Sequence, residues 1–96
     1  MKAGEQMGQR LPYKQDITYP MIRYIRLSRN CTQEKLGRIA GIDQSVIAKL
    51  EKGELELTPI YESRIRQAIR SLRISNHEID AIRKLIELKE IRGYRP

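Results

Sequence analysis

The 96-residue sequence contains no phenylalanine, no tryptophan and a single cysteine, Cys31. A core without Phe or Trp must be built from aliphatic side chains, chiefly isoleucine and leucine. Small aliphatic cores are most readily closed by helices that pack along apolar stripes, so we expect an all-α domain. A single cysteine forms neither an internal disulfide nor a cysteine-based zinc site.

Long apolar runs are also absent. No stretch approaches the roughly 18 consecutive apolar residues that span a membrane, and the N-terminus lacks the apolar segment of a signal peptide. We therefore expect a soluble, cytoplasmic protein. The single histidine, His77, has no set of metal ligands at suitable spacing. No nucleophile triad, phosphate-binding glycine loop or carboxylate pair suggests catalysis. The sequence thus predicts no enzyme, no metal and no cofactor.

The charge balance is strongly basic. Nineteen Lys and Arg residues oppose 12 Asp and Glu residues, which gives a formal net charge of +7. Such a field favours a polyanionic partner, nucleic acid first and an anionic membrane surface second. Arg66, Arg70 and Arg73 are expected on one face of a helix. That face either contacts phosphates or is simply the solvated side of the helix.

Composition and periodicity divide the chain into three parts. Residues 1–15 are polar, contain glycine and proline, and are predicted to be a flexible N-terminal arm. Residues 16–73 are predicted to form the main domain. Residues 74–96 carry a last helix, and its apolar residues either complete the core or join two copies as a dimer.

Apolar periodicity and end signals predict five helices. Thr32 and Asp43 are expected N-caps, and Ser75 with Glu78 has the spacing of a capping box. Gly41 is expected to end a helix, because glycine adopts a positive φ without steric cost. The predicted helices cover residues 18–28, 33–40, 44–52, 58–72 and 76–90.

The segment 33–53 meets the physical requirements of a helix-turn-helix. Gly37 is the small residue at which two short helices cross, and Gly41 allows the tight turn between them. Polar residues remain on the outer face of the second helix, which must enter a groove. Apolar residues lock the pair onto the domain: Leu36, Ala40, Ile42, Ile47 and Leu50.

This segment resembles the Cro and lambda-repressor (XRE) family of DNA-binding domains, and the similarity covers residues 21–72. The resemblance implies a five-helix, lambda-repressor-like fold with an extra C-terminal helix. It implies that helix 44–52 enters the major groove of double-stranded DNA. There the residues that contact bases would be Gln44, Ser45, Ala48 and Lys49.

The same resemblance implies roles outside the base-contacting set. Gln33, Lys35 and Lys52 would contact phosphates. Arg26 and Glu51 would form an internal ion pair that orients the recognition helix. Cys31 falls between two helices, where the family tends to have apolar residues, so the resemblance favours buried packing of this cysteine over redox sensing.

One loop departs from the family pattern. It carries Glu54 and Glu56, where family members commonly have polar or basic residues. Either this loop turns away from the DNA, or the DNA follows a different path.

Two functions follow as hypotheses. The first is a transcriptional repressor of phage or mobile-element type, acting as a homodimer on a palindromic operator. The alternative is a protein-interaction module, such as an antitoxin whose last helix binds a toxin.

Overall fold

The computed structural model describes residues 16–92, and in that range it contains five α-helices and no strand. The predicted all-α, lambda-repressor-like fold is confirmed, and each predicted helix boundary lies within one residue of the observed one. The predicted N-terminal arm, residues 1–15, lies outside the described residues. The helices are α1 (Tyr19–Leu27), α2 (Gln33–Ala40), α3 (Gln44–Glu51), α4 (Pro59–Ser71) and α5 (Asn76–Ile91).

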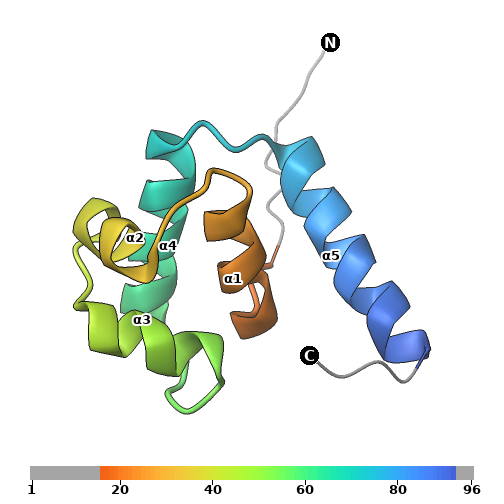
Figure 1. Ribbon diagram of the computed structural model, residues 1–96, viewed down its shortest axis with the longest axis horizontal. Helices are drawn as coiled ribbons and strands as arrows, with labels where there is room; N and C mark the ends of the chain where they lie inside the picture. Colours follow the sequence, from red (N-terminus) through yellow and green to blue (C-terminus); the bar gives the residue numbers. More distant parts are fainter. Residues whose placement is uncertain (1–15, 93–96) are drawn as a thin grey trace, which may run out of the picture.

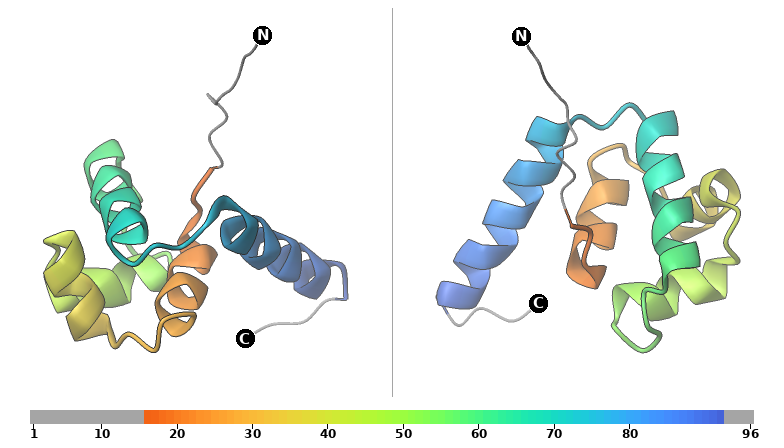
Figure 2. Two further views of the ribbon diagram at one scale, coloured as in Figure 1. Left: turned by 90° about the horizontal axis from the view of Figure 1, so that it is seen from above. Right: turned by 180° about the vertical axis from the view of Figure 1, so that it is seen from behind.

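Helix α1 lies at the centre of the arrangement (Figure 1), with α2, α3 and α4 on one side and α5 on the other. The two further views in Figure 2 show the same separation of α5 from the α2–α4 group. Contacts join α1 to α3 and to α5, and they join α2 to α3 and to α4. Helix α5 therefore covers a side of α1 that the helix-turn-helix leaves free.

Local side chains determine where the helices begin and end. The Thr32 hydroxyl accepts a hydrogen bond from the Lys35 N–H, and the Asp43 carboxylate accepts one from the Ser45 N–H. Both are the N-caps that the sequence predicts, and each satisfies an N–H group that the helix leaves unpaired. Gly41 ends α2 with a φ of 69°, in the left-handed region that glycine adopts most easily.

The core is aliphatic, as the lack of Phe and Trp requires. It holds α3 through Ile47 and Leu50, and burying each such side chain stabilises the fold by about 2 kcal/mol. Cys31 is buried and free, as predicted. The largest fully buried side chains are Met21, Ile22, Ile25, Leu36, Ile47, Leu50 and Ile65.

The two halves of α5 differ in burial. Ile79, in its second turn from the N-terminus, is 3% exposed and belongs to the core, and Ile82 and Ile86 pack against that core. The C-terminal half exposes three large apolar side chains, because α1 reaches only one side of it. These are Leu85, Leu88 and Ile91. The first half of α5 therefore completes the core, while the second half leaves an apolar surface.

An ion pair that the sequence did not predict joins the turn after α1 to the start of α5. The Arg29 guanidinium donates to both carboxylate oxygens of Glu78, at 2.8 and 3.0 Å. It also donates to the carbonyl oxygens of Leu72 and Arg73. Glu78 still forms the predicted capping box with Ser75. One carboxylate therefore caps α5 and anchors it to α1.

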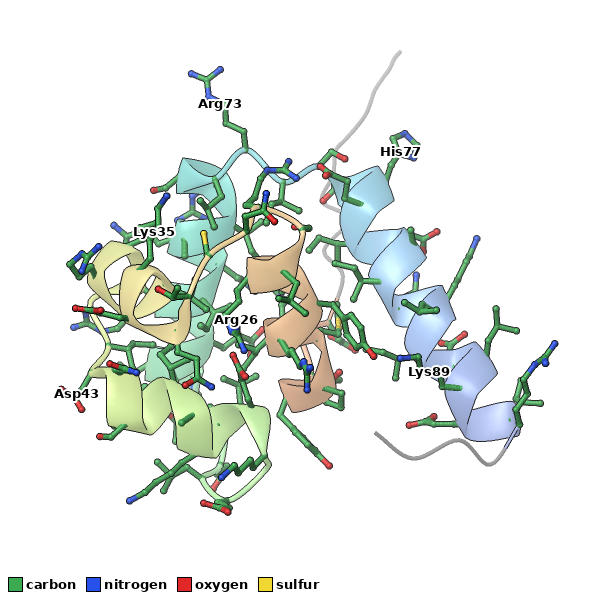
Figure 3. All side chains as sticks on the ribbon, in the orientation of Figure 1. Arg26, Lys35, Asp43, Arg73, His77 and Lys89 are labelled. Carbon is green, nitrogen blue, oxygen red and sulfur yellow. The ribbon has the colours of Figure 1, made fainter. Side chains whose placement is uncertain are left out.

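The predicted arrangement of Arg66, Arg70 and Arg73 on one helical face is wrong. Helix α4 ends at Ser71, and Arg73 lies beyond it with a φ of 57°. Figure 3 shows the Arg73 side chain extending from this loop away from the helices. Arg66 is not on a fully solvated side either, because its guanidinium donates to Glu62 and its side chain is only 19% exposed.

The Arg29–Glu78 pair predicts how stability depends on pH. Hydrogen bonds from Arg29 lower the pKa of Glu78 from 4.5 to about 2. Because the folded state holds this pKa below its unfolded value, the pair stabilises the fold above pH 4.5, and that contribution is lost as the pH falls toward 2. Glu78→Gln keeps a capping-box side chain but removes the charge. Its melting temperature should lie below that of the wild type at neutral pH and converge with it in acid, in thermal denaturation followed by circular dichroism. An equal difference at both ends of the pH range would contradict this account.

Candidate nucleic-acid interface

Helices α2 and α3 meet at Gly37. A Cβ atom at this position would lie 2.4 Å from the carbonyl oxygen of Ile42. The Ile42 N–H donates to the Gly37 carbonyl oxygen at 2.9 Å, which closes the turn. No side chain fits between the two backbones, so only glycine allows this approach. The crossing places the N-terminus of α3 at the surface of the domain.

Helix α3 turns one face inward and the other outward. Ile47 and Leu50 have no exposed surface. The opposite face is formed by two rows of residues at four-residue intervals, 44, 48 and 52 in one row and 45 and 49 in the other, so members of a row lie one turn apart. Ala48 on this face is half-buried. The four exposed residues around it are Gln44, Ser45, Lys49 and Lys52. The structure thus brings together on one surface the four residues predicted to contact bases.

The first turn of α3 is held by Asp43. Its carboxylate oxygen Oδ2 accepts a hydrogen bond from the Ser45 hydroxyl at 2.5 Å and another from the Ser45 N–H at 3.1 Å. These two bonds, the hydroxyl bond first, lower the pKa of Asp43. The carboxylate is therefore ionised at neutral pH, and its negative charge interacts favourably with the positive end of the helix dipole. In Figure 3, Asp43 lies at the outer corner of the domain where α3 begins.

A three-residue network joins α1, α2 and α3. The Arg26 guanidinium donates to the two carboxylate oxygens of Glu51 at 2.7 and 3.1 Å. These side chains are only 15% and 8% exposed, and the hydrogen bond to Glu51 raises the pKa of Arg26. Arg26 also donates to the carbonyl oxygen of Cys31. The Gln33 amide donates to the same Glu51 carboxylate at 3.1 Å, an addition that the sequence did not predict. Figure 3 shows Arg26 between α1 and α3.

The C-terminus of α3 is held by a contact that the sequence also did not predict. Gly53 has a φ of 75°, and a Cβ there would lie 2.9 Å from the ring of Tyr19. The N–H of Glu54 donates to the carbonyl oxygen of Lys49, which closes the helix. Both ends of α3 are therefore constrained by residues outside the helix.

Residues 22–61 match a family model described as helix-turn-helix. These residues form an XRE-type helix-turn-helix. The match begins within α1, contains all of α2 and α3, and ends at the start of α4. No curated protein and no solved structure matches the chain significantly. Domains of this type bind DNA and regulate transcription, and this general activity is what the match supports.

The remaining predicted residues lie at the edge of the XRE domain or apart from α3. Gln33 is the first residue of α2, and its amide already donates to Glu51. Lys35 is exposed, but in the view of Figure 3 it rises above α2, whereas α3 lies below. Glu54 and Glu56 are exposed in the loop between α3 and α4.

Residues 16–92 contain neither a candidate metal site nor a candidate membrane span. No three His, Cys, Asp or Glu side chains in this range gather where they could hold a metal ion. None of the described helices is both long and apolar enough to cross a membrane.

Proposed function

We propose that the protein is a sequence-specific transcriptional repressor that inserts α3 into the major groove of DNA. The outer face of α3 carries the proposal, because its exposed side chains are small or polar while its inner face is fixed in the core. Gln44 offers one donor and one acceptor, which match the N7 and N6 atoms of adenine. Lys49 suits a guanine or a phosphate, and Ala48 suits a thymine methyl group. Ser45 completes the base-contacting set.

Phosphate contacts flank this face in the proposal. Gln33 begins α2, where unpaired N–H groups and the helix dipole favour an anion. Its amide donates one hydrogen to Glu51, and the second hydrogen is available for a phosphate. Lys52 follows the end of α3, and Lys35 would contact a phosphate farther along the backbone. These contacts position the domain without selecting a sequence.

The repressor is proposed to act as a homodimer on a palindromic operator, as in regulators of phage or mobile elements. The exposed second half of α5 supplies an apolar surface for pairing two copies. A two-fold dimer would place two recognition helices about one DNA turn apart, roughly 34 Å. Occupation of such an operator would exclude RNA polymerase from an overlapping promoter.

Substitutions on α3 test the groove contacts. Gln44→Ala and Lys49→Ala should each weaken binding to a selected duplex about tenfold, because each removes contacts to base edges worth ~1–3 kcal/mol. Both residues are exposed, so the melting temperature should stay unchanged. Affinity is measured by fluorescence anisotropy with a duplex selected from a random pool.

Gln67→Ala is the matched control, because Gln67 is an exposed glutamine on α4. It should bind like the wild type. Unchanged affinity in both α3 variants would refute the assignment of this face. Sequence-blind binding that disappears at moderate salt would indicate only a basic surface.

A charge on α5 tests the dimer. Leu88 is 56% exposed, so Leu88→Glu should leave the fold intact while it converts a dimer to a monomer in analytical ultracentrifugation. Ile60→Glu is the matched control, because Ile60 is an apolar residue on α4 that is 68% exposed. It should leave the dimer unchanged. A wild-type protein that is monomeric both free and on DNA would contradict the homodimer.

The same α5 surface supports a second candidate, a protein-interaction module such as an antitoxin that binds a toxin. Isolation of a stable, stoichiometric protein partner, combined with no affinity of the free chain for DNA, would favour this second function.

A further inference from the structure

The Ser45 hydroxyl has a fixed role within the first turn of α3. Its oxygen lies 2.5 Å from Oδ2 of Asp43, and the same carboxylate oxygen accepts the Ser45 N–H at 3.1 Å. Two bonds from one residue to one oxygen hold the serine side chain in a single orientation. Ser45 is nevertheless an exposed residue on the outer face of α3.

The direction of the hydroxyl bond follows from the charge of Asp43. The two bonds from Ser45 lower the pKa of this carboxyl, so it is ionised at neutral pH and can only accept. A serine hydroxyl has one hydrogen, and Asp43 takes it. What remains on the oxygen of Ser45 is its acceptor capacity.

Turning this hydroxyl toward a base acceptor would be unfavourable. Hydrogen bonds to a carboxylate are shorter and about twice as strong as bonds between neutral groups. A rotation toward N7 or O6 of guanine, or O4 of thymine, would replace the stronger bond by a weaker one. The negative charge of Asp43 would also lie beside these electronegative atoms and repel them. Both effects favour a donor on the DNA.

In the major groove, the donors on the bases are the exocyclic amines, N6 of adenine and N4 of cytosine. We propose that Ser45 accepts a hydrogen bond from one of these amines and donates none to a base. The inference rests on the proposed function, since it requires α3 to lie in the groove. It assigns Asp43 as a positioning residue, which determines the direction of a contact that Ser45 makes.

The neighbouring Gln44 provides an internal comparison. Its side-chain amide has both donors and an acceptor, so it can pair with an amine and with N7 at once. Ser45, held by Asp43, should distinguish these two groups. The two adjacent residues are therefore expected to respond differently when single atoms are removed from a base.

Changes to single groups on the bases are needed, because every base pair presents one exocyclic amine in the major groove and a base-pair exchange only moves that amine. The experiment uses the full chain and a duplex selected from a random pool. At each half-site position, adenine is replaced by purine or cytosine by 2-pyrimidinone, either of which removes the amine. Separately, each purine is replaced by its 7-deaza analogue, which removes N7. Affinities are measured for the wild type, Ser45→Ala and Gln44→Ala.

At one position, loss of the amine should weaken wild-type binding about fivefold, the size of an ordinary hydrogen bond, and should not weaken binding of Ser45→Ala. Removal of N7 should weaken the wild type and Ser45→Ala by the same factor at every position. In contrast, Gln44→Ala should reduce the sensitivity of binding both to the loss of one amine and to the loss of one N7. A residue whose removal changes the effect of losing a base group is said to couple to that group. Coupling of Ser45 to an N7, or to no atom of a specifically bound duplex, would overturn the inference.

Asp43→Asn provides the second arm. The asparagine oxygen still accepts the Ser45 N–H and caps α3, but the neutral amide holds the hydroxyl less strongly. Coupling between Ser45 and an N7 should then appear in this variant. If it does not, Asp43 does not control the direction of the contact, and the inference fails. If no duplex is selected by the wild type, the proposed function itself fails, which keeps the two failures separate.

Discussion

Gly37→Ala should lower the free energy of unfolding by about 3 kcal/mol, although alanine normally favours a helix over glycine by ~1 kcal/mol. The steric clash of the new Cβ outweighs the helix preference of alanine, so the net change in stability is a loss. The new Cβ would lie 2.4 Å from the carbonyl oxygen of Ile42, and that oxygen belongs to the backbone of the turn, which cannot rotate away. Relief requires α2 and α3 to separate, which weakens the 2.9 Å hydrogen bond between Ile42 and Gly37.

Gly41→Ala is the comparison for this prediction. Its φ of 69° disfavours alanine, but the nearest atom to the new Cβ is the end of the flexible Arg64 side chain. We therefore expect a loss of only about 1 kcal/mol. Urea denaturation followed by circular dichroism measures both variants. If Gly37→Ala unfolds at the wild-type urea concentration, the crossing of α2 and α3 is not as close as described.

Glu51→Ala should lower stability by about 3 kcal/mol and also weaken operator binding. The substitution leaves Arg26, whose side chain is 15% exposed in the intact pair, with no carboxylate partner, and it removes an acceptor from Gln33. Removing one partner of a buried ion pair is costly because the remaining charge stays desolvated. Helix α3 also loses its polar connection to α1 and α2. Operator affinity at a temperature where the variant is fully folded should fall about tenfold, because a displaced helix loses contacts to base edges.

An exposed ion pair provides the control. Glu34 and Arg38 approach to 3.3 Å on α2, but their side chains are 67% and 68% exposed. Glu34→Ala should change stability by less than about 0.5 kcal/mol, because solvent screens such pairs. Combining Arg26→Met with Glu51→Ala should cost less than the sum of the two single changes, since no unpaired charge is then left inside. Additive effects would show that Arg26 and Glu51 do not stabilise the fold as a pair.

The Arg29–Glu78 pair connects the DNA-binding domain to the proposed dimer surface. Arg29 follows the end of α1, and Glu78 lies in the first turn of α5, so the pair fixes the angle at which α5 leaves the domain. In a dimer formed through α5, that angle would determine the distance between the two recognition helices. The weaker pair at low pH would then affect operator spacing as well as stability.

Much of the helix-turn-helix was predictable from the sequence because its signals are local. The caps at Thr32 and Asp43 and the turn at Gly41 involve residues within one helical turn of each other. The need for glycine at position 37 follows from two short helices that must cross within the same 21-residue segment. Ile47 and Leu50 are buried because apolar spacing determines which side of a helix faces the core.

Tertiary structure alone decided the contacts between distant residues. Arg29 and Glu78 lie 49 residues apart, and Tyr19 covers Gly53 from another helix. Nothing in the local spacing pairs them, because such contacts depend on the angles at which the helices pack. The burial of α5 depends on the same angles, since Ile79 is buried in the core whereas Leu88, on the same helix, is exposed. Periodicity determined which faces are apolar and where the helices end, whereas packing determined which of those faces meet.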